Sequence, residues 1–140
     1  MGAPDPQKLR REFRLPAEDE VFLGQLGLPW ETVTASGQRW VLIYGQQVPA
    51  GYNVDSVDVA VMMAPGYPPG PLDMAYLFPP LIRANGVAPR SAEGRVTIDD
   101  KAWQAWSRHR DGEACWQLGE DNLESHYFYM LSWLTNELQR

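Results

Sequence analysis

The stretch Pro65-Gly66-Tyr67-Pro68-Pro69-Gly70-Pro71 separates two segments, Val57 to Met63 and Asp73 to Phe78, whose composition predicts β-strands. Its four prolines fix the backbone dihedral φ and remove hydrogen-bond donors, so this stretch can form neither a helix nor a central strand. The residue before each proline is also restricted to extended conformations. The sequence therefore predicts a stiff, preformed connection between two strands.

The segments around this connection predict an antiparallel meander of about four strands. Val57, Val59 and Val61 alternate with smaller or polar residues, which is typical of a strand. Further upstream, residues 32–34 and 39–44 flank a short polar turn and predict a hairpin. Because these connections are short and local, neighbouring strands must run antiparallel.

Helices are predicted at both ends of the meander. Ala17 to Leu26 has acidic residues in its first turn and is followed by Gly27, a typical helix end. Apolar residues at helical spacing from Leu123 to Leu138 predict a final amphipathic helix capped by Asp121. His126 lies off the apolar stripe of this helix and is expected to face solvent.

Between the meander and the final helix, residues 79–100 are expected to form a long irregular loop. Residues 101–109 are expected to form a short helix. The predicted fold class is α+β, with the helices packed on the sheet. Residues 1–14 are expected to be an N-terminal tail, and residues 15–140 a single domain.

Composition limits the function. The net charge of −6 argues against a nucleic-acid-binding surface, which requires clustered positive charge. A single cysteine permits neither an internal disulfide nor a cysteine metal cluster. No segment is long and apolar enough to span a membrane, and the N-terminus has no apolar signal core. We therefore expect a cytoplasmic protein without a metal or other cofactor.

Several short motifs lie in a fixed order between about residues 15 and 135. They are Leu15-Pro16, Trp30-Glu31-Thr32-Val33, Pro49-Ala50-Gly51-Tyr52-Asn53, Pro65-Gly66-Tyr67-Pro68, Leu72-Asp73-Met74, Trp103-Gln104-Ala105-Trp106-Ser107-Arg108-His109 and Trp116. In order and spacing they resemble prokaryotic family E of the ubiquitin-conjugating (UBC) superfamily. The resemblance implies a UBC-like fold and an operon-encoded conjugation pathway, as in phage defence. The expected partners are a ubiquitin-like protein and an activating enzyme, with a desubiquitinase-like metalloprotease in the same pathway and no nucleic acid or membrane.

The catalytic residues depart from the family pattern. A typical conjugating enzyme has a His-Pro-Asn motif before a nucleophilic cysteine, which itself precedes a tryptophan. Trp116 fits that tryptophan, but the cysteine position is occupied by Ser107 and Arg108, and the chain has no His-Pro-Asn motif. The only cysteine, Cys115, directly precedes Trp116. The usual thioester machinery is therefore not expected.

Ser107 and His109 are the candidate catalytic residues. A serine needs a general base to act as a nucleophile at neutral pH, and histidine is the side chain most often used. If the segment is extended, both side chains lie on one face. Transfer through Ser107 would give an oxyester; alternatively, both are ordinary surface residues. Cys115 is an alternative nucleophile, although we expect a structural role because cysteine usually behaves as a small buried hydrophobe.

Two functions remain open at this point. The chain either accepts or carries the modifier from the activating enzyme, or it is a catalytically inactive adaptor that binds the modifier or its enzymes. A domain unrelated to conjugation is a third, weaker alternative. The face formed by residues 65–71 and 79–100 is expected to bind a partner, since preformed proline-rich backbone loses little entropy on binding. The expected binding residues are Tyr67, Pro68, Leu72 and Phe78, with Trp103 and Trp106 as either a recognition cluster or core.

Overall fold

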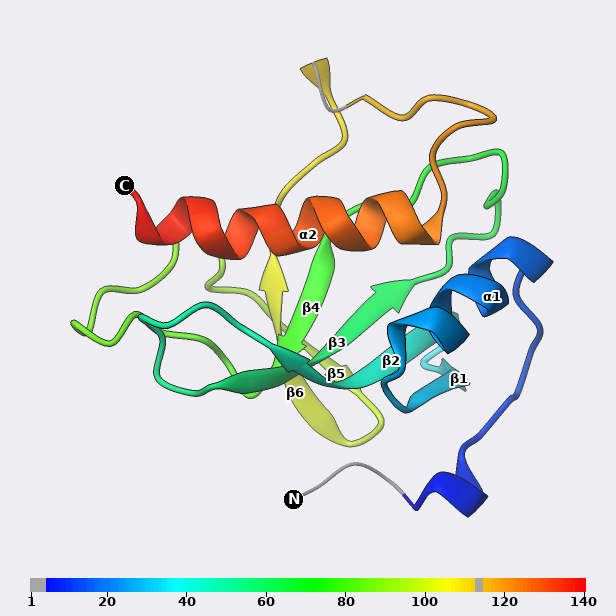
Figure 1. Ribbon diagram of the computed structural model, residues 1–140, viewed down its shortest axis with the longest axis horizontal. Coiled ribbons are helices and arrows are strands. Elements are labelled where there is room, and N and C mark those ends of the chain that lie inside the picture. Colours follow the sequence, from blue (N-terminus) through cyan, green and yellow to red (C-terminus); the bar gives the residue numbers. More distant parts are fainter. Residues whose placement is uncertain (1–4, 113–114) are drawn as a thin grey trace.

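The computed structural model describes residues 5–112 and 115–140 and confirms the α+β class (Figure 1). Its elements are the short 3-10 helix η1 (Pro6–Lys8), α1 (Ala17–Leu26), β1 (Trp30–Ala35), β2 (Gln38–Gln47), β3 (Ser56–Met62), β4 (Ala75–Phe78), β5 (Arg95–Ile98), β6 (Lys101–Trp106) and α2 (Leu123–Leu138). The strands form one antiparallel sheet in the order β1-β2-β3-β4-β6-β5. No helix in the described ranges is long and apolar enough to cross a membrane.

The sheet has six strands, so the predicted four-stranded meander is incomplete. The expected short helix over residues 101–109 is wrong, because residues 101–106 form β6. Trp103 and Trp106 are three apart, which fits one face of a helix, but here they pack into two different cores. The β5–β6 connection uses Asp99 and Asp100, both at positive φ, as a tight hairpin requires.

The helices cover one face of the sheet, with α2 lying across the strands (Figure 1). The main core lies between the helices and the sheet. In it, the Phe22 ring of α1 packs against the Tyr127 ring of α2, with centroids 5.7 Å apart. A second core, including Trp40 and Trp103, fills the opposite face of the sheet. Both faces of the central strand β2 are therefore buried, as its nearly continuous apolar run predicts.

Arg10 in the N-terminal segment links the two edges of the sheet, at β1 and at the β5–β6 turn. The Arg10 guanidinium donates to Glu31 in β1 (2.9 and 2.8 Å) and to Asp99 in the β5–β6 turn (2.9 and 2.7 Å). Burial alone would raise the pKa of Glu31, but hydrogen bonds from Arg10 and Tyr44 lower it to about 2. We call this arrangement the Arg10 clasp. Residues 1–4 of the predicted tail lie outside the described ranges.

Residues 10–12 also run alongside β1. The Thr32 amide donates to the Arg10 carbonyl at 3.1 Å, and the Glu12 amide donates to the Thr32 carbonyl at 2.9 Å. This part of the N-terminal segment is therefore hydrogen-bonded to the sheet.

Candidate active site

Ser107, His109 and Asp73 form a continuous hydrogen-bonded chain at the surface. The Ser107 Oγ lies 3.2 Å from His109 Nε2, and His109 Nδ1 lies 2.9 Å from Asp73 Oδ2. The sheet register explains the juxtaposition: β4 and β6 are antiparallel, and Ala75 is opposite Trp106. Asp73, just before β4, therefore lies beside the residues just after β6.

The hydrogen bonds define the role of each atom. A carboxylate can only accept, so the neutral imidazole donates its Nδ1–H to Asp73 and leaves the Nε2 lone pair for the Ser107 hydroxyl. The other Asp73 oxygen, Oδ1, accepts from the Arg110 amide at 3.1 Å and so fixes the carboxylate. The hydrogen bond to Asp73 raises the pKa of His109. The arrangement is that of a serine, a general base and a residue that orients the base.

Cys115 lies on the surface, so the prediction that it is a buried structural residue is wrong. Its Sγ accepts a hydrogen bond from Gln117 Nε2 at 3.1 Å. Within residues 5–112 and 115–140, no hydrogen bond joins this thiol to a histidine or carboxylate that could act as its base. Ser107 has such a partner in His109, whereas the contact described for the Cys115 sulfur is with Gln117.

Arg110, which sequence reasoning missed, attaches the segment after the site to α2. Its guanidinium pairs with Asp121 at 3.0 Å and lies over the rings of Trp116 (4.9 Å) and Tyr129 (5.1 Å). The side chain is only 8% exposed. Ion pairing together with stacking on two rings makes Arg110 a structural anchor for the segment between the site and α2. An arginine one residue after His109 gave no signal of this in the sequence.

His126 is fully buried, so the prediction that it faces solvent is wrong. Its Nε2 lies 2.8 Å from the Met74 carbonyl and its Nδ1 lies 3.1 Å from Arg110 Nη1. Both neighbours are satisfied by a neutral ring that donates from Nε2 and accepts at Nδ1. Burial lowers the pKa of His126. A polar residue off the apolar stripe is thus buried because its two partners satisfy it.

The cap of α2 also differs from the prediction. Asn122, not Asp121, is the N-cap, and its side chain accepts from the Ser125 amide at 3.0 Å. Asp121 instead accepts from the Ser125 hydroxyl and pairs with Arg110. Asp121, which the sequence predicted to be the helix cap, therefore holds the segment before α2 through its ion pair with Arg110.

Replacing Arg110 by alanine is expected to lower the free energy of unfolding by about 3 kcal/mol, since it leaves the Asp121 carboxylate without its cation. Urea denaturation measures this loss. Arg14→Ala is the control, because Arg14 is 83% exposed in its pair with Glu20 and should cost less than about 1 kcal/mol. Equal losses in the two variants would contradict the anchoring role of Arg110.

The two histidines are expected to give opposite pH dependences of stability. Below its ordinary pKa of 6.5, His126 protonates in the unfolded chain before the folded one, because its folded pKa is lowered; acidification therefore destabilises the fold. The folded pKa of His109 is raised, so its stabilisation is complete below 6.5 and is lost as the pH rises through that raised pKa. Thermal melts between about pH 5 and pH 8 measure this difference. On acidification, the Tm of His109→Ala should fall more steeply than that of the wild type, and the Tm of His126→Gln should fall less steeply. Identical slopes in all three proteins would refute this assignment.

Most of the predicted binding residues lie inside the protein. Leu72, Trp103 and Trp106 are at most 1% exposed, so they pack the cores and offer no surface to a partner. Phe78 is partly buried against Trp103, with ring centroids 5.7 Å apart. Pro68 is exposed and remains a candidate for contact with a partner.

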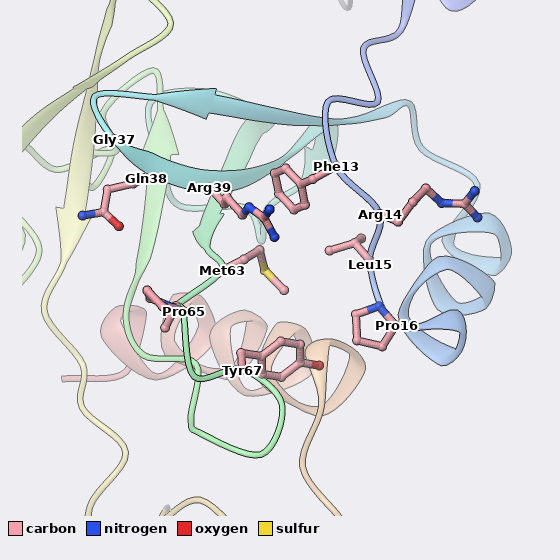
Figure 2. A pocket seen from close by; sticks show the side chains of 11 residues that line it. Phe13, Arg14, Leu15, Pro16, Gly37, Gln38, Arg39, Met63, Pro65 and Tyr67 are labelled. Atoms are coloured by element: carbon pink, nitrogen blue, oxygen red, sulfur yellow. The ribbon is translucent and has the colours of Figure 1, made fainter.

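Tyr67 links the proline-rich turn to both helices. Its hydroxyl donates to Asp19 Oδ2 in α1 at 2.6 Å and accepts from the Leu123 amide at the start of α2 at 3.0 Å. Its ring also borders a cavity of about 330 Å³ with Phe13, Arg39 and Met63 (Figure 2). Substitution of Tyr67 would therefore disturb the fold as well as any interface.

The two segments of the predicted binding face lie at opposite ends of α2. The turn over residues 65–71 contacts the N-terminal end through Tyr67 and Leu123. In the loop after β4, Arg83 donates to the Leu138 carbonyl at the C-terminal end. A helix of 16 residues is about 24 Å long, so the two segments do not form one face.

A different surface adjoins the proline-rich turn. A second cavity of about 330 Å³ is lined by Pro68, Pro69, Trp116 and Leu118, among others. The Trp116 Nε1–H donates to the Pro69 carbonyl at 3.1 Å, which ties the two segments together. Leu118 is 71% exposed, the most exposed of the large hydrophobic side chains described. We call this the Leu118 surface.

The antiparallel sheet backed by two helices is an α+β arrangement, and Ser107 and His109 lie just after its strand β6. The family Prokaryotic E2 family E matches residues 15–137, and the chain belongs to that family. No curated protein and no solved structure matches the chain. In the described ranges, no group of three histidine, cysteine, aspartate or glutamate side chains is placed to hold a metal ion.

Proposed function

We propose that this protein accepts a ubiquitin-like modifier from an activating enzyme and carries it as an oxyester on Ser107. Membership of the E2 family supports the general role in conjugation. The observation that carries the specific proposal is the hydrogen-bonded chain from Ser107 through His109 to Asp73. It supplies the base that a serine needs to act as a nucleophile near neutral pH.

The transfer step follows from this geometry. The Ser107 oxygen attacks the thioester carbonyl carbon at the C-terminus of the modifier, and the hydroxyl proton moves to His109 Nε2. A carbon–oxygen bond forms as the carbon–sulfur bond breaks. The departing thiolate of the activating enzyme then takes the proton from His109. Asp73 stabilises the imidazolium between these two proton transfers.

The chemical stability of the adduct tests this proposal. The protein is mixed with activating enzyme, ATP and modifier, and a conjugate is sought by mass. An oxyester resists mild reducing agents but is cleaved by base or hydroxylamine, whereas reducing agents remove a thioester on Cys115. Binding without any adduct would reject the proposal and support the inactive adaptor, which the missing His-Pro-Asn motif favours.

The Leu118 surface is proposed to contact the modifier or the activating enzyme. An exposed leucine beside prolines and a tryptophan is apolar surface that a partner can bury, and tryptophan is enriched at protein interfaces. Leu118→Ser is expected to weaken binding roughly tenfold or more, as measured by calorimetry or pull-down. Val87→Ser is the matched control, since Val87 is also exposed (43%) but lies in the loop near the other end of α2. Equal binding by both variants would reject this surface.

A further inference from the structure

We infer that the chain from Ser107 through His109 to Asp73 gives this protein a hydrolase activity of its own toward small activated acyl esters. This activity requires neither the activating enzyme nor the modifier. It uses the same serine as the proposed function and differs from it in the acyl donor and in the final acceptor, which is water.

The geometry contains the nucleophile, the base and the orienting carboxylate that such a reaction uses. The nucleophile and base are 3.2 Å apart, and the base and its orienting carboxylate are 2.9 Å apart. The carboxylate is itself held by the Arg110 amide. A serine, a base and an orienting group in this sequence of contacts define the acyl-transfer arrangement irrespective of fold.

The exposure of the site determines the class of substrate. Ser107 is exposed, His109 is 56% exposed and Asp73 is 45% exposed. Neither of the cavities of about 330 Å³ described above is lined by any of the three residues. Among the described residues, neither of these cavities offers the site a pocket for a long acyl chain, so the site suits small acyl groups with good leaving groups, such as aryl acetates. Water has equal access to the acylated serine.

The reaction has two balanced steps. First, Ser107 Oγ attacks the ester carbonyl, its proton moves to His109 Nε2, the bond to the aryl oxygen breaks, and the phenol leaves with that proton. Water then attacks the acyl-serine carbonyl while His109 takes its proton and returns it to Ser107 Oγ. The products are a phenol and a carboxylic acid, and the enzyme is regenerated. Asp73 acts as a positioning residue through His109.

Hydrolysis of p-nitrophenyl acetate by the purified chain tests the inference. Ser107→Ala should hydrolyse the ester at least tenfold more slowly than the wild type, after subtraction of the rate without protein. Ser132→Ala removes another exposed serine hydroxyl and should retain the wild-type rate. A fluorophosphonate probe should label Ser107, as identified by peptide mass, and the label should be missing from Ser107→Ala. Hydrolysis by Ser107→Ala at the wild-type rate, or a label on another residue, would overturn the inference.

The role of Asp73 has its own readout. In the wild type, the rate should rise with pH through an apparent pKa above 6.5, since the base acts only when unprotonated. Asp73→Asn should move this rise to lower pH and reduce the plateau. A reduced plateau without any movement of the rise would indicate a merely structural role. An unchanged profile would remove Asp73 from the reaction.

The outcomes also separate this inference from the proposed function. Hydrolysis of the small ester without a modifier adduct would support the inference and reject the proposed carrier role. An adduct that depends on Ser107, without detectable ester hydrolysis or probe labelling, would do the reverse.

Discussion

Replacing Ser107 by alanine is expected to abolish the covalent adduct with the modifier, whereas replacing Cys115 by alanine is expected to leave it intact. Of the two nucleophiles, Ser107 has a base at 3.2 Å, and the contact described for the Cys115 sulfur is with the amide of Gln117. Alanine removes the only atom of Ser107 that can form the ester. Gel shift and intact-protein mass, with the activating enzyme charged beforehand, measure the adduct.

Reversed behaviour of the two variants would establish Cys115 as the acceptor and overturn the assignment. Because both residues are exposed, neither substitution removes core packing. Equal melting temperatures of the two variants and the wild type would show that loss of the adduct is chemical.

His109→Ala is expected to slow adduct formation by roughly 10²–10⁴-fold, the usual contribution of a positioned general base. Without the imidazole, the Ser107 proton has no acceptor as the carbon–oxygen bond forms. Single-turnover transfer from charged activating enzyme measures the rate, and separate binding experiments with the modifier should show unchanged affinity. A wild-type transfer rate would exclude His109 as the base.

The elements with strong local signals were predicted well. The first helix has its observed bounds, Ala17–Leu26, since both its acidic first turn and Gly27 act locally. The hairpin of β5 and β6 was missed because two tryptophans three apart fit a helix as well as a strand. Pairing of β6 with β4, a long-range contact, resolves that ambiguity, and no local pattern encodes it.

The candidate site was predicted only in its local part. Ser107 and His109 are two residues apart, so their meeting depends only on the local backbone. Asp73 lies 36 residues from His109 and reaches it only through the register of β4 and β6. Arg110 and His126 are likewise joined by tertiary packing. A single sequence carries no signal for such contacts between distant residues.

The Arg10 clasp limits how this protein can recruit other chains. Many proteins bind an extended peptide by adding it as a further strand to an exposed sheet edge. Residues 10–12 already hydrogen-bond to Thr32 on the outer side of β1, and Arg10 fastens this segment to Glu31 and Asp99. The chain thus uses its own N-terminal segment to guard this edge against self-association, a known hazard of open sheets. At the β1 edge, a partner must therefore recognise side-chain surfaces or first displace the N-terminal segment.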